Sequence, residues 1–364
     1  MKGNIDSYKC LHATGRERTR FNEVPNYQEG LYQLENQCYA WMVPNGSWGE
    51  SNAGLIVGNG ESLLVDTLWD AKYTKEMLQS MESLVQEAPL KYVVNTHADG
   101  DHYWGNELVK DLDIITTQAS LEEMVAVKPK SMVLFGRLGK WMSMLKVFGN
   151  AQAGHWFQQM VKPYDFHLVQ QTPAKRSFQG ELDLDVGGRK VRLIEVGPAH
   201  TQGDLIVHVP DARLVYTADI LFIGSTPVMW AGPIENWFKA LDTIQALDAE
   251  TIVPGHGPIT DHDGVEWVRS YWKFVQEKVE ACFKEGMSAP QAAHAIVLSD
   301  DFAQSPFANW NSPERMMTNA HTLYRHLQGR KDHPKVPELI GIMRKQALLA
   351  HKLPNAQPAS IRKK

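Results

Sequence analysis

Short apolar runs separated by Gly, Asn and Pro dominate the first part of the chain and predict β-strands. One such run lies within residues 31–43, and two more, rich in Leu, Ile and Val, lie at 54–58 and 62–66. The last two runs flank Asn59-Gly60, a strong signal for the turn of a β-hairpin. The pattern therefore predicts paired strands in this region.

Helical spacing follows the hairpin. Residues 70–86 repeat apolar side chains every three or four positions, which predicts an amphipathic helix that Asp70 caps. Further strands are expected at 92–94, 114–117, 181–186, 190–196, 205–209, 213–216 and 251–253, and further helices at 120–127 and 236–247. Strands that alternate with helices predict an α/β protein built from packed layers.

The pattern divides the chain into four parts. Residues 1–29 are polar and irregular and are expected to form an N-terminal arm or a loosely packed edge, and residues 30–262 form the α/β domain. Residues 263–330 are expected to be a helical extension packed on that domain, because apolar periodicity marks 265–284, 289–298 and 313–327. Residues 331–364 are basic and contain Pro, which predicts a poorly ordered tail.

Residues 128–172 differ from the rest of the α/β domain. They are rich in Met and aromatic side chains with basic residues interleaved, which predicts helices that are not cleanly amphipathic. The segment is either part of the core, a surface for a homo-oligomer, or a lid insertion. As a lid, it would line an apolar pocket for a bulky substrate with Trp141, Phe148 and Trp156. Trp230 either approaches the same pocket or packs in the core.

Composition restricts the classes of function. The chain has 364 residues, 43% hydrophobic and 22% charged, with a formal net charge of −5. Because basic residues do not cluster outside the tail, no nucleic-acid partner is expected. No apolar run approaches the roughly 20 residues of a membrane span, and the N-terminus has no apolar segment typical of a secretory signal. Three widely spaced cysteines form no disulfide framework, so a cytoplasmic protein is expected. The possible apolar pocket at 128–172 adds the expectation of a small-molecule substrate.

Side chains that bind metals gather directly after the predicted strand at 92–94. His97, Asp99, Asp101 and His102 lie within six residues of one another. An ordinary loop gains nothing from two carboxylates and two imidazoles held so close together, whereas a bound cation turns the cluster into a coordination site. The spacing therefore predicts a metal site.

Three further candidate ligands each follow a predicted strand. His200 lies in Gly-Pro-Ala-His-Thr-Gln-Gly, Asp219 in Tyr-Thr-Ala-Asp-Ile, and His256 in Val-Pro-Gly-His-Gly-Pro. Gly and Pro beside a ligand hold tight turns that aim one side chain. Taken alone, each residue is more typical of a loop or a turn than of a metal site.

Taken together and in this order, the segments resemble the metallo-β-lactamase superfamily over residues 30–262. That family has the pattern H-x-H-x-D-H, and this chain has His-Ala-Asp-Gly-Asp-His at 97–102. Its later ligands lie in Gly-His-Thr-x-Gly, Thr-Gly-Asp and Pro-Gly-His-Gly contexts, which are similar to those around His200, Asp219 and His256. The resemblance implies a four-layer αββα sandwich, here with a helical insertion and a helical C-terminal extension.

The resemblance also implies two metal sites that share a carboxylate. The implied ligands are His97, Asp99 and His200 for one ion, Asp101, His102 and His256 for the other, and Asp219 between them. Nitrogen and oxygen ligands without Cys suit one or two zinc ions and allow iron or manganese. Zinc lowers the pKa of a bound water to about 7, which supplies an attacking hydroxide. Asp101 and His102 would then be catalytic, with proton shuttling by Asp101 as a secondary role.

Asp99 departs from the family, in which histidine is usual at this position. It is either a ligand that makes the first site more tolerant of iron or manganese, or a change that leaves one metal. The expected function is a metal-dependent hydrolase of a bulky, apolar ester, thioester, lactone, amide or aromatic halide. The alternatives are an iron-dependent oxidoreductase of the same fold, although no Gly-rich flavin-binding signature is found, and a degenerate member without catalysis.

Overall fold

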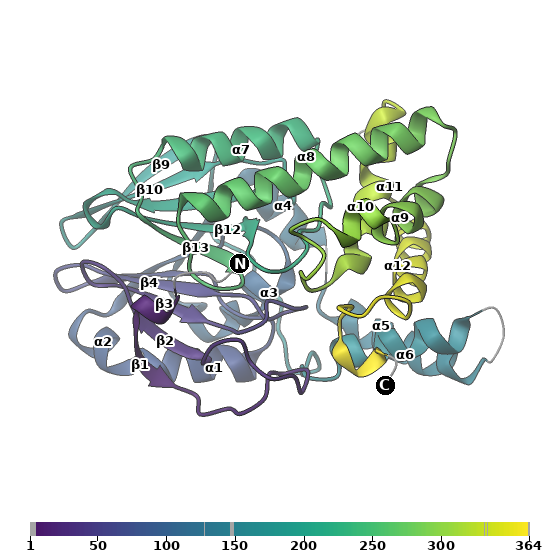
Figure 1. Ribbon diagram of the computed structural model, residues 1–364. Coiled ribbons are helices and arrows are strands. Elements are labelled where there is room, and N and C mark those ends of the chain that lie inside the picture. The colour runs from purple at the N-terminus through teal and green to yellow at the C-terminus, as the bar shows by residue number, and fades with distance from the viewer. Residues whose placement is uncertain (1–4, 127, 146–148, 331, 333, 363–364) are drawn as a thin grey trace.

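Two β-sheets face each other and carry helices on both outer sides (Figure 1). The structure, a computed structural model, describes residues 5–126, 128–145, 149–330, 332 and 334–362. The arrangement confirms the four-layer αββα sandwich predicted from the sequence. In Figure 1 the remaining helices gather at the right-hand end of the two sheets.

The first sheet contains eight strands in sequence order. They are β1 (Lys9–Ala13), β2 (Gly30–Gln33), β3 (Cys38–Met42), β4 (Ala53–Val57), β5 (Ser62–Val65), β6 (Leu90–Val94), β7 (Asp113–Thr117) and β8 (Arg176–Phe178). Strands β1 to β5 pair antiparallel and β5 to β8 pair parallel. The predicted hairpin at Asn59-Gly60 joins β4 to β5. Helices α1 (Ala71–Ser80), α2 (Glu82–Glu87) and α4 (Gln118–Ala126) belong to the parallel half.

The second sheet contains five strands in the order β13-β12-β11-β10-β9. They are β9 (Glu181–Val186), β10 (Arg189–Glu195), β11 (Leu205–Val209), β12 (Leu214–Phe222) and β13 (Thr251–His256). Only the β12–β13 pair is parallel, and the crossover between these strands is α7 (Ile234–Ala246). Together with α8 (His262–Lys284), α7 covers the outer face of this sheet (Figure 1).

The core of the sandwich lies between the sheets. Ile56, Leu63 and Val94 of the first sheet and Val191 and Val207 of the second are fully buried in one apolar cluster. Burial of a side chain of this size contributes about 1.5–3 kcal/mol. This packing fixes the strand ends on which the ligand-bearing loops stand.

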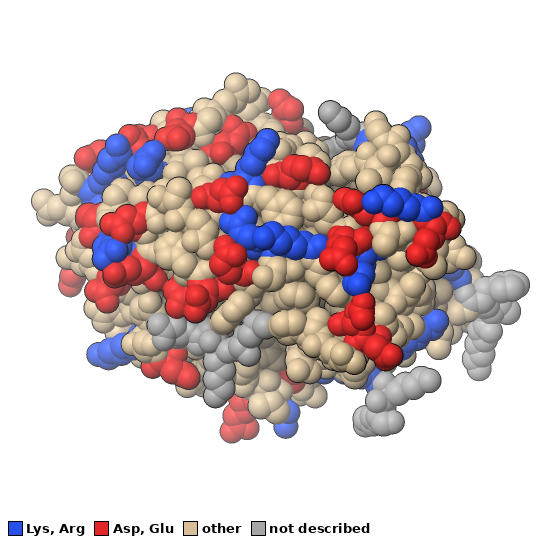
Figure 2. All heavy atoms as spheres, turned by 45° about the horizontal axis from the view of Figure 1, so that its top comes forward, with Lys and Arg blue, Asp and Glu red and all other residues tan. Residues whose placement is uncertain are grey.

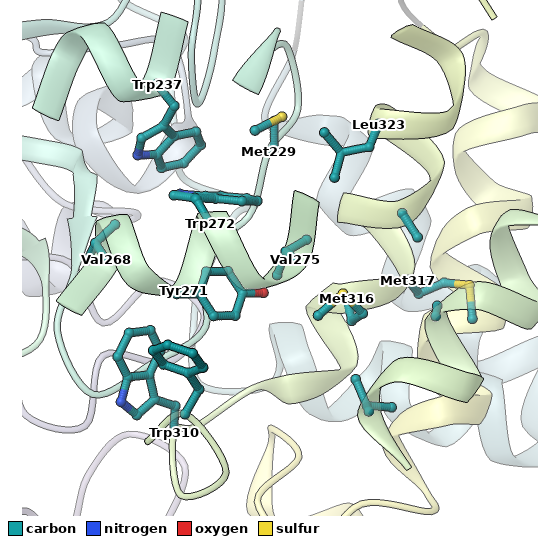
Figure 3. Close-up of a cluster of buried hydrophobic side chains, with 14 of the residues drawn as sticks. Met229, Trp237, Val268, Tyr271, Trp272, Val275, Trp310, Met316, Met317 and Leu323 are labelled. Carbon is teal, nitrogen blue, oxygen red and sulfur yellow. The ribbon is translucent and has the colours of Figure 1, made fainter. Parts of the chain in front are cut away.

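The C-terminal extension is helical, as predicted. Its further helices are α9 (Ala289–Val297), α10 (Asp300–Ala303), η4 (Pro313–Arg315), α11 (Met316–Leu327) and α12 (Val336–Ala350). A second apolar cluster joins α8 to α11: Tyr271 and Trp272 of α8 lie near Met316 at the start of α11, with Trp310 below them (Figure 3). The extension is thus part of the core.

The two chain ends compare differently with the expectation. Of the two alternatives for the N-terminus, residues 9–13 fit the edge rather than the free arm, because β1 pairs with β2 at the edge of the first sheet. The prediction of a poorly ordered tail is wrong for its described residues: α12 buries Ala347 and Leu349, and Gln357 is fully buried beyond it. The basic and Pro-containing composition of residues 331–364 did not indicate that α12 has an apolar face.

The 128–172 insertion forms a helical hairpin of α5 (Lys130–Met144) and α6 (Asn150–Val161). The two helices approach closely where Gly139 faces Gly154: a Cβ atom on Gly154 would lie 2.5 Å from the carbonyl oxygen of Gly139. Helix α6 packs against α12. The insertion is therefore joined to the C-terminal helices, at the lower right of Figure 1.

The surface over α7 and α8 carries intermixed acidic and basic side chains (Figure 2). One ion pair, Arg269 to Asp242 at 2.8 Å, links the two helices. Across the described part of the chain, we find no helix with the length and apolar character needed to cross a membrane.

Candidate metal centre

The seven predicted ligands converge at one end of the sandwich. His97 follows β6, Asp99 precedes the short helix α3 (Gly100–Tyr103), and this helix carries Asp101 and His102. The others lie between β10 and β11, within β12 and at the end of β13. Three groups have ligand atoms within 4.8 Å of one another: His97, Asp99 and His200; His97, His102 and Asp219; and Asp101, His102 and His256.

Asp219 is the centre of this arrangement. Its Oδ2 lies 3.3 Å from His200 Nε2, 3.4 Å from His256 Nε2 and 3.9 Å from His97 Nε2. Its Oδ1 lies 3.1 Å from His102 Nε2. One carboxylate therefore faces four imidazoles, which is the position of a shared ligand.

The two remaining carboxylates flank this centre on different sides. Asp99 Oδ2 lies 3.1 Å from His200 Nε2, and Asp101 Oδ2 lies 3.5 Å from His256 Nε2. The Asp99 side chain is 35% exposed and that of Asp101 14%, whereas the four histidines are buried. Solvent thus reaches the centre past these two carboxylates, and past Asp99 more than past Asp101.

Backbone geometry explains how β12 and β13 deliver their ligands. Ala218 adopts a positive φ of 45° at a register shift between the strands, which turns the chain just before Asp219. Gly255 must lack a side chain, because a Cβ atom there would lie 2.0 Å from Asp219 Oδ1. The Pro-Gly-His motif therefore makes room for the carboxylate and places His256 beside it.

Hydrogen bonds orient three of the histidines. Asp66 Oδ2 lies 2.9 Å from His102 Nδ1 and accepts a bond from the Thr96 hydroxyl at 2.7 Å. Since that hydroxyl is a donor to Asp66, it accepts from His97 Nδ1 at 3.0 Å. His200 Nδ1 donates to a backbone carbonyl at 2.7 Å. Each Nδ1 carries a proton, so each ring, when neutral, presents the lone pair of Nε2 to the centre.

The charges of the centre shift its proton affinities. Burial, together with the charge of His102, lowers the pKa of His97 well below its usual range. Burial also acts to lower the pKa of His200, but Asp219 and Asp99 raise it to about 9. Burial acts to raise the pKa of Asp219, but His256, His102 and His200 hold it well below its usual range. The carboxylate of Asp219, at the middle of the centre, is therefore ionised.

Several buried polar atoms of the centre lack a hydrogen bond among the described residues. These atoms are His97 Nε2, His102 Nε2 and Asp219 Oδ1. Leaving such groups unsatisfied is costly, and native proteins rarely do so. A cation would satisfy all three, and the imidazole and carboxylate donors without a thiolate are those that zinc, iron and manganese accept. The residues therefore fit a metal centre.

The predicted substrate residues have different surroundings. Trp230 lies at the centre, where its Nε1 donates to Asp99 Oδ2 at 3.0 Å. Trp156 is fully buried and donates its Nε1–H to the carbonyl of Gln357 at 2.8 Å, so it is a core residue rather than a pocket surface. Trp141 is 56% exposed on α5, and Phe148 lies outside the described residues.

One aromatic residue near the centre escaped the sequence analysis. Trp48, on the loop between β3 and β4, lies between Trp156 and Trp230, with ring centroids 6.1 and 6.5 Å away. The loop carries no motif that indicates a site. The role of Asp66 in orienting His102 is visible only in the structure.

The fold and the ligand cluster define an α/β sandwich protein with a metal-binding centre at the strand ends. Residues 46–256 match the model of the metallo-beta-lactamase superfamily. The chain belongs to this superfamily, which confirms the resemblance found in the sequence.

Individual relatives are distant. The alpha subunit of a 2,4-dinitroanisole O-demethylase from Nocardioides sp. (strain JS1661) is 24% identical over 72% of this chain and 66% of that protein. A type 2 metallo-beta-lactamase from Bacillus sp. (strain 170) is 25% identical over 60% of this chain and 70% of that protein. A sec-alkylsulfatase structure from Pseudomonas sp. shares the fold with a TM-score of 0.60 and 15% identity, over 85% of this chain and 51% of that chain.

Proposed function

We propose that this chain is a metal-dependent hydrolase of a small molecule. The observation that carries the proposal is the convergence of seven imidazole and carboxylate side chains, several of whose buried nitrogen and oxygen atoms have no hydrogen-bond partner among the described residues. The matched relatives include hydrolases, which supports the same reaction class. We propose zinc as the preferred metal, since the donors are mainly imidazoles.

The residues of the centre would have different roles, according to their positions. A bound metal of this kind supplies an activated water and stabilises negative charge on the substrate. His97, His102 and His200 would hold it through Nε2, and Asp219 would join the two halves of the centre. Burial acts to raise the pKa of Asp101, but His102 and His256 hold it below the usual range, so its carboxylate stays ionised and would bind metal, with proton transfer as a secondary role. No serine or cysteine nucleophile is required.

The proposal about the chemical class of the substrate rests on Trp48 and Trp230. Both rings are partly exposed; Trp230 donates to Asp99 of the centre, and the ring of Trp48 lies beside that of Trp230. Aromatic walls around a few polar groups are typical of small-molecule sites. We therefore propose a substrate with an apolar or aromatic body attached to an ester, thioester, lactone, amide or halide carbon.

Asp99 motivates a second candidate, an iron-dependent oxidoreductase. Its carboxylate lies in the first ligand group with His97 and His200, and an added oxygen ligand makes a site more favourable for iron or manganese. The two candidates differ in the metal that they require.

Metal analysis combined with a substrate panel separates the candidates. Protein purified without added metal is assayed for metal content and for hydrolysis of chromogenic esters, thioesters, lactones, phosphodiesters and haloaromatics. Zinc with hydrolysis of one class supports the proposal. Two irons with a redox-active optical band and no hydrolysis would replace it with the oxidoreductase.

A further inference from the structure

One face of α11 in the C-terminal extension is hydrogen-bonded to the loop after β12, residues 223–232. Arg315, just before this helix, donates from Nη1 to the carbonyl of Thr226 at 2.8 Å. One turn later, Asn319 accepts from the Met229 amide and donates to the Pro227 carbonyl, both at 2.9 Å. These side chains are buried, and they satisfy backbone groups of an otherwise irregular segment.

Thr322 completes this face. Its hydroxyl donates to the Met229 carbonyl at 2.8 Å. The side chain of Met229 lies between Leu323 of α11 and Trp272 of α8 (Figure 3), so apolar packing and hydrogen bonds hold the same loop residue. We call the side chains of Arg315, Asn319 and Thr322 the α11 ladder.

The loop held by the α11 ladder in turn holds a metal ligand. The amides of Trp230 and Ala231 donate to the carbonyl of His200 at 2.9 and 3.1 Å. The ring of His200 donates from Nδ1 to the carbonyl of Val228 at 2.7 Å. Backbone and ring of His200 are therefore both positioned by residues 228–231.

The same loop also contacts Asp99, which belongs to the same ligand group as His200. Trp230 Nε1 donates to Asp99 Oδ2 at 3.0 Å, and that oxygen lies 3.1 Å from His200 Nε2. By contrast, His102 is oriented by Asp66 from the first sheet. Residues 228–231 of the loop thus act on His200 and Asp99, whereas Ile223 at the start of the loop donates its amide to the carbonyl of His256 at 3.0 Å.

We propose that the α11 ladder consists of positioning residues for the metal site formed by His97, Asp99 and His200. The inference rests on the proposed metal centre. Partners that orient a metal-binding histidine change metal affinity by about 10- to 100-fold when they are lost. The C-terminal extension is then a component of the metal site, and it acts on that half rather than on the half with Asp101, His102 and His256.

The test compares two threonines of α11 that differ in the face they occupy. Thr322→Val removes the hydroxyl that bonds to Met229. Thr318→Val is the matched control, because Thr318 is also buried and its hydroxyl bonds at 2.6 Å to Gln346, away from the loop. Asn319→Asp adds a second ladder variant of unchanged size that loses the donor to Pro227. Thr322→Ser restores the hydroxyl.

The readout is the affinity for zinc of the full-length, chelator-stripped protein, measured for each bound ion by competition with a chromophoric chelator. We expect Thr322→Val and Asn319→Asp to weaken one of two binding steps about 10-fold or more, with Thr318→Val and Thr322→Ser unchanged. His200→Ala identifies the weakened step. Equal affinities in Thr322→Val and Thr318→Val would overturn the inference.

Thermal unfolding of the two threonine variants separates an effect on metal binding from an effect on folding. Both variants lose one buried hydrogen bond, so they are expected to lose similar stability while only Thr322→Val loses zinc affinity. If Thr322→Val weakens both zinc-binding steps equally, the claim that the α11 ladder acts on one half of the centre is contradicted. If wild-type protein binds zinc but hydrolyses no substrate, the proposed reaction fails while the inference about α11 is still decided by the affinities.

Discussion

At the scale of single residues, the centre depends on which atom of each side chain is already engaged. Asp66 and Thr96 fix the Nδ1 atoms of His102 and His97, so both rings offer Nε2. Removing either ring therefore removes a ligand and also leaves its buried partner, Asp66 or Thr96, without that hydrogen bond. Substitutions here test the proposed roles directly.

His102→Ala and His256→Ala are expected to abolish hydrolysis, by about 10³-fold or more, because each removes a ligand beside Asp101 and Asp219. Steady-state rates on the substrate found in the panel measure the loss. His294→Ala on α9, away from the centre, is the control and is expected to keep full activity. Near-wild-type rates in both ligand variants would contradict the assigned centre.

Asp99→His tests whether Asp99 is a ligand. The variant restores the imidazole that is usual in the superfamily, so it is expected to bind metal and to shift preference from iron or manganese towards zinc. A competition experiment with equal concentrations of zinc and manganese measures that preference. An unaltered ratio would show that Asp99 does not bind the metal.

At the scale of elements, the insertion and the C-terminal helices form one unit with the site loops. Trp156 of α6 contacts Trp48 and donates to Gln357, while Trp141 of α5 faces solvent. The sequence predicted both tryptophans as pocket residues only under the lid alternative, because Met and aromatic residues are dense throughout the hairpin and do not distinguish a lid from core. Which of them is buried depends on α12, whose packing no local pattern indicates.

Trp156→Ala is expected to destabilise the fold by about 3–5 kcal/mol, since it leaves a cavity in the core. Trp141→Ala is expected to change stability by less than about 0.5 kcal/mol, because its side chain is mostly exposed. Urea unfolding of the metal-free protein measures both. A comparable loss in the two variants would refute the assignment of Trp156 to the core.

The sequence could predict the parts of the site that lie in short local motifs, but not the parts that depend on how distant helices pack. The sequence predicted all seven side chains that the structure brings together, because each lies in a short motif in or directly after a predicted strand, and packed sheets bring such segments together. The α11 ladder and Trp48 were not found. Asn319 bonds to a loop residue 90 positions earlier in the chain, and Trp48 has no motif of its own. Their role follows from how the extension packs on the sandwich.

At the scale of the whole molecule, buried charge makes stability depend on pH. Glu50 is fully buried; Oε2 accepts from the amide of Ser47, and Oε1 has no partner among the described residues. Burial raises the pKa of Glu50 to about 8, with Arg20 opposing the shift and Glu23 and Glu29 adding to it. The folded chain therefore retains a proton that the unfolded chain releases near pH 4.5.

The sign of this effect follows from proton linkage. Stability from the protonated carboxyl is complete below about pH 4.5 and is lost as pH rises through about 8. Glu50→Gln stays neutral, so its thermal midpoint is expected to fall less than that of wild type between about pH 6 and about pH 9. Parallel pH profiles for the two proteins would contradict the assigned pKa shift.

The binding stoichiometry of zinc tests the central claim most directly. Chelator-stripped wild-type protein and Asp219→Ala are dialysed to equilibrium against zinc, and metal per chain is measured by mass spectrometry. If Asp219 joins two sites, wild type binds two ions per chain and Asp219→Ala loses most of this binding. No more zinc in wild type than in Asp219→Ala would contradict the metal centre and the hydrolase built on it.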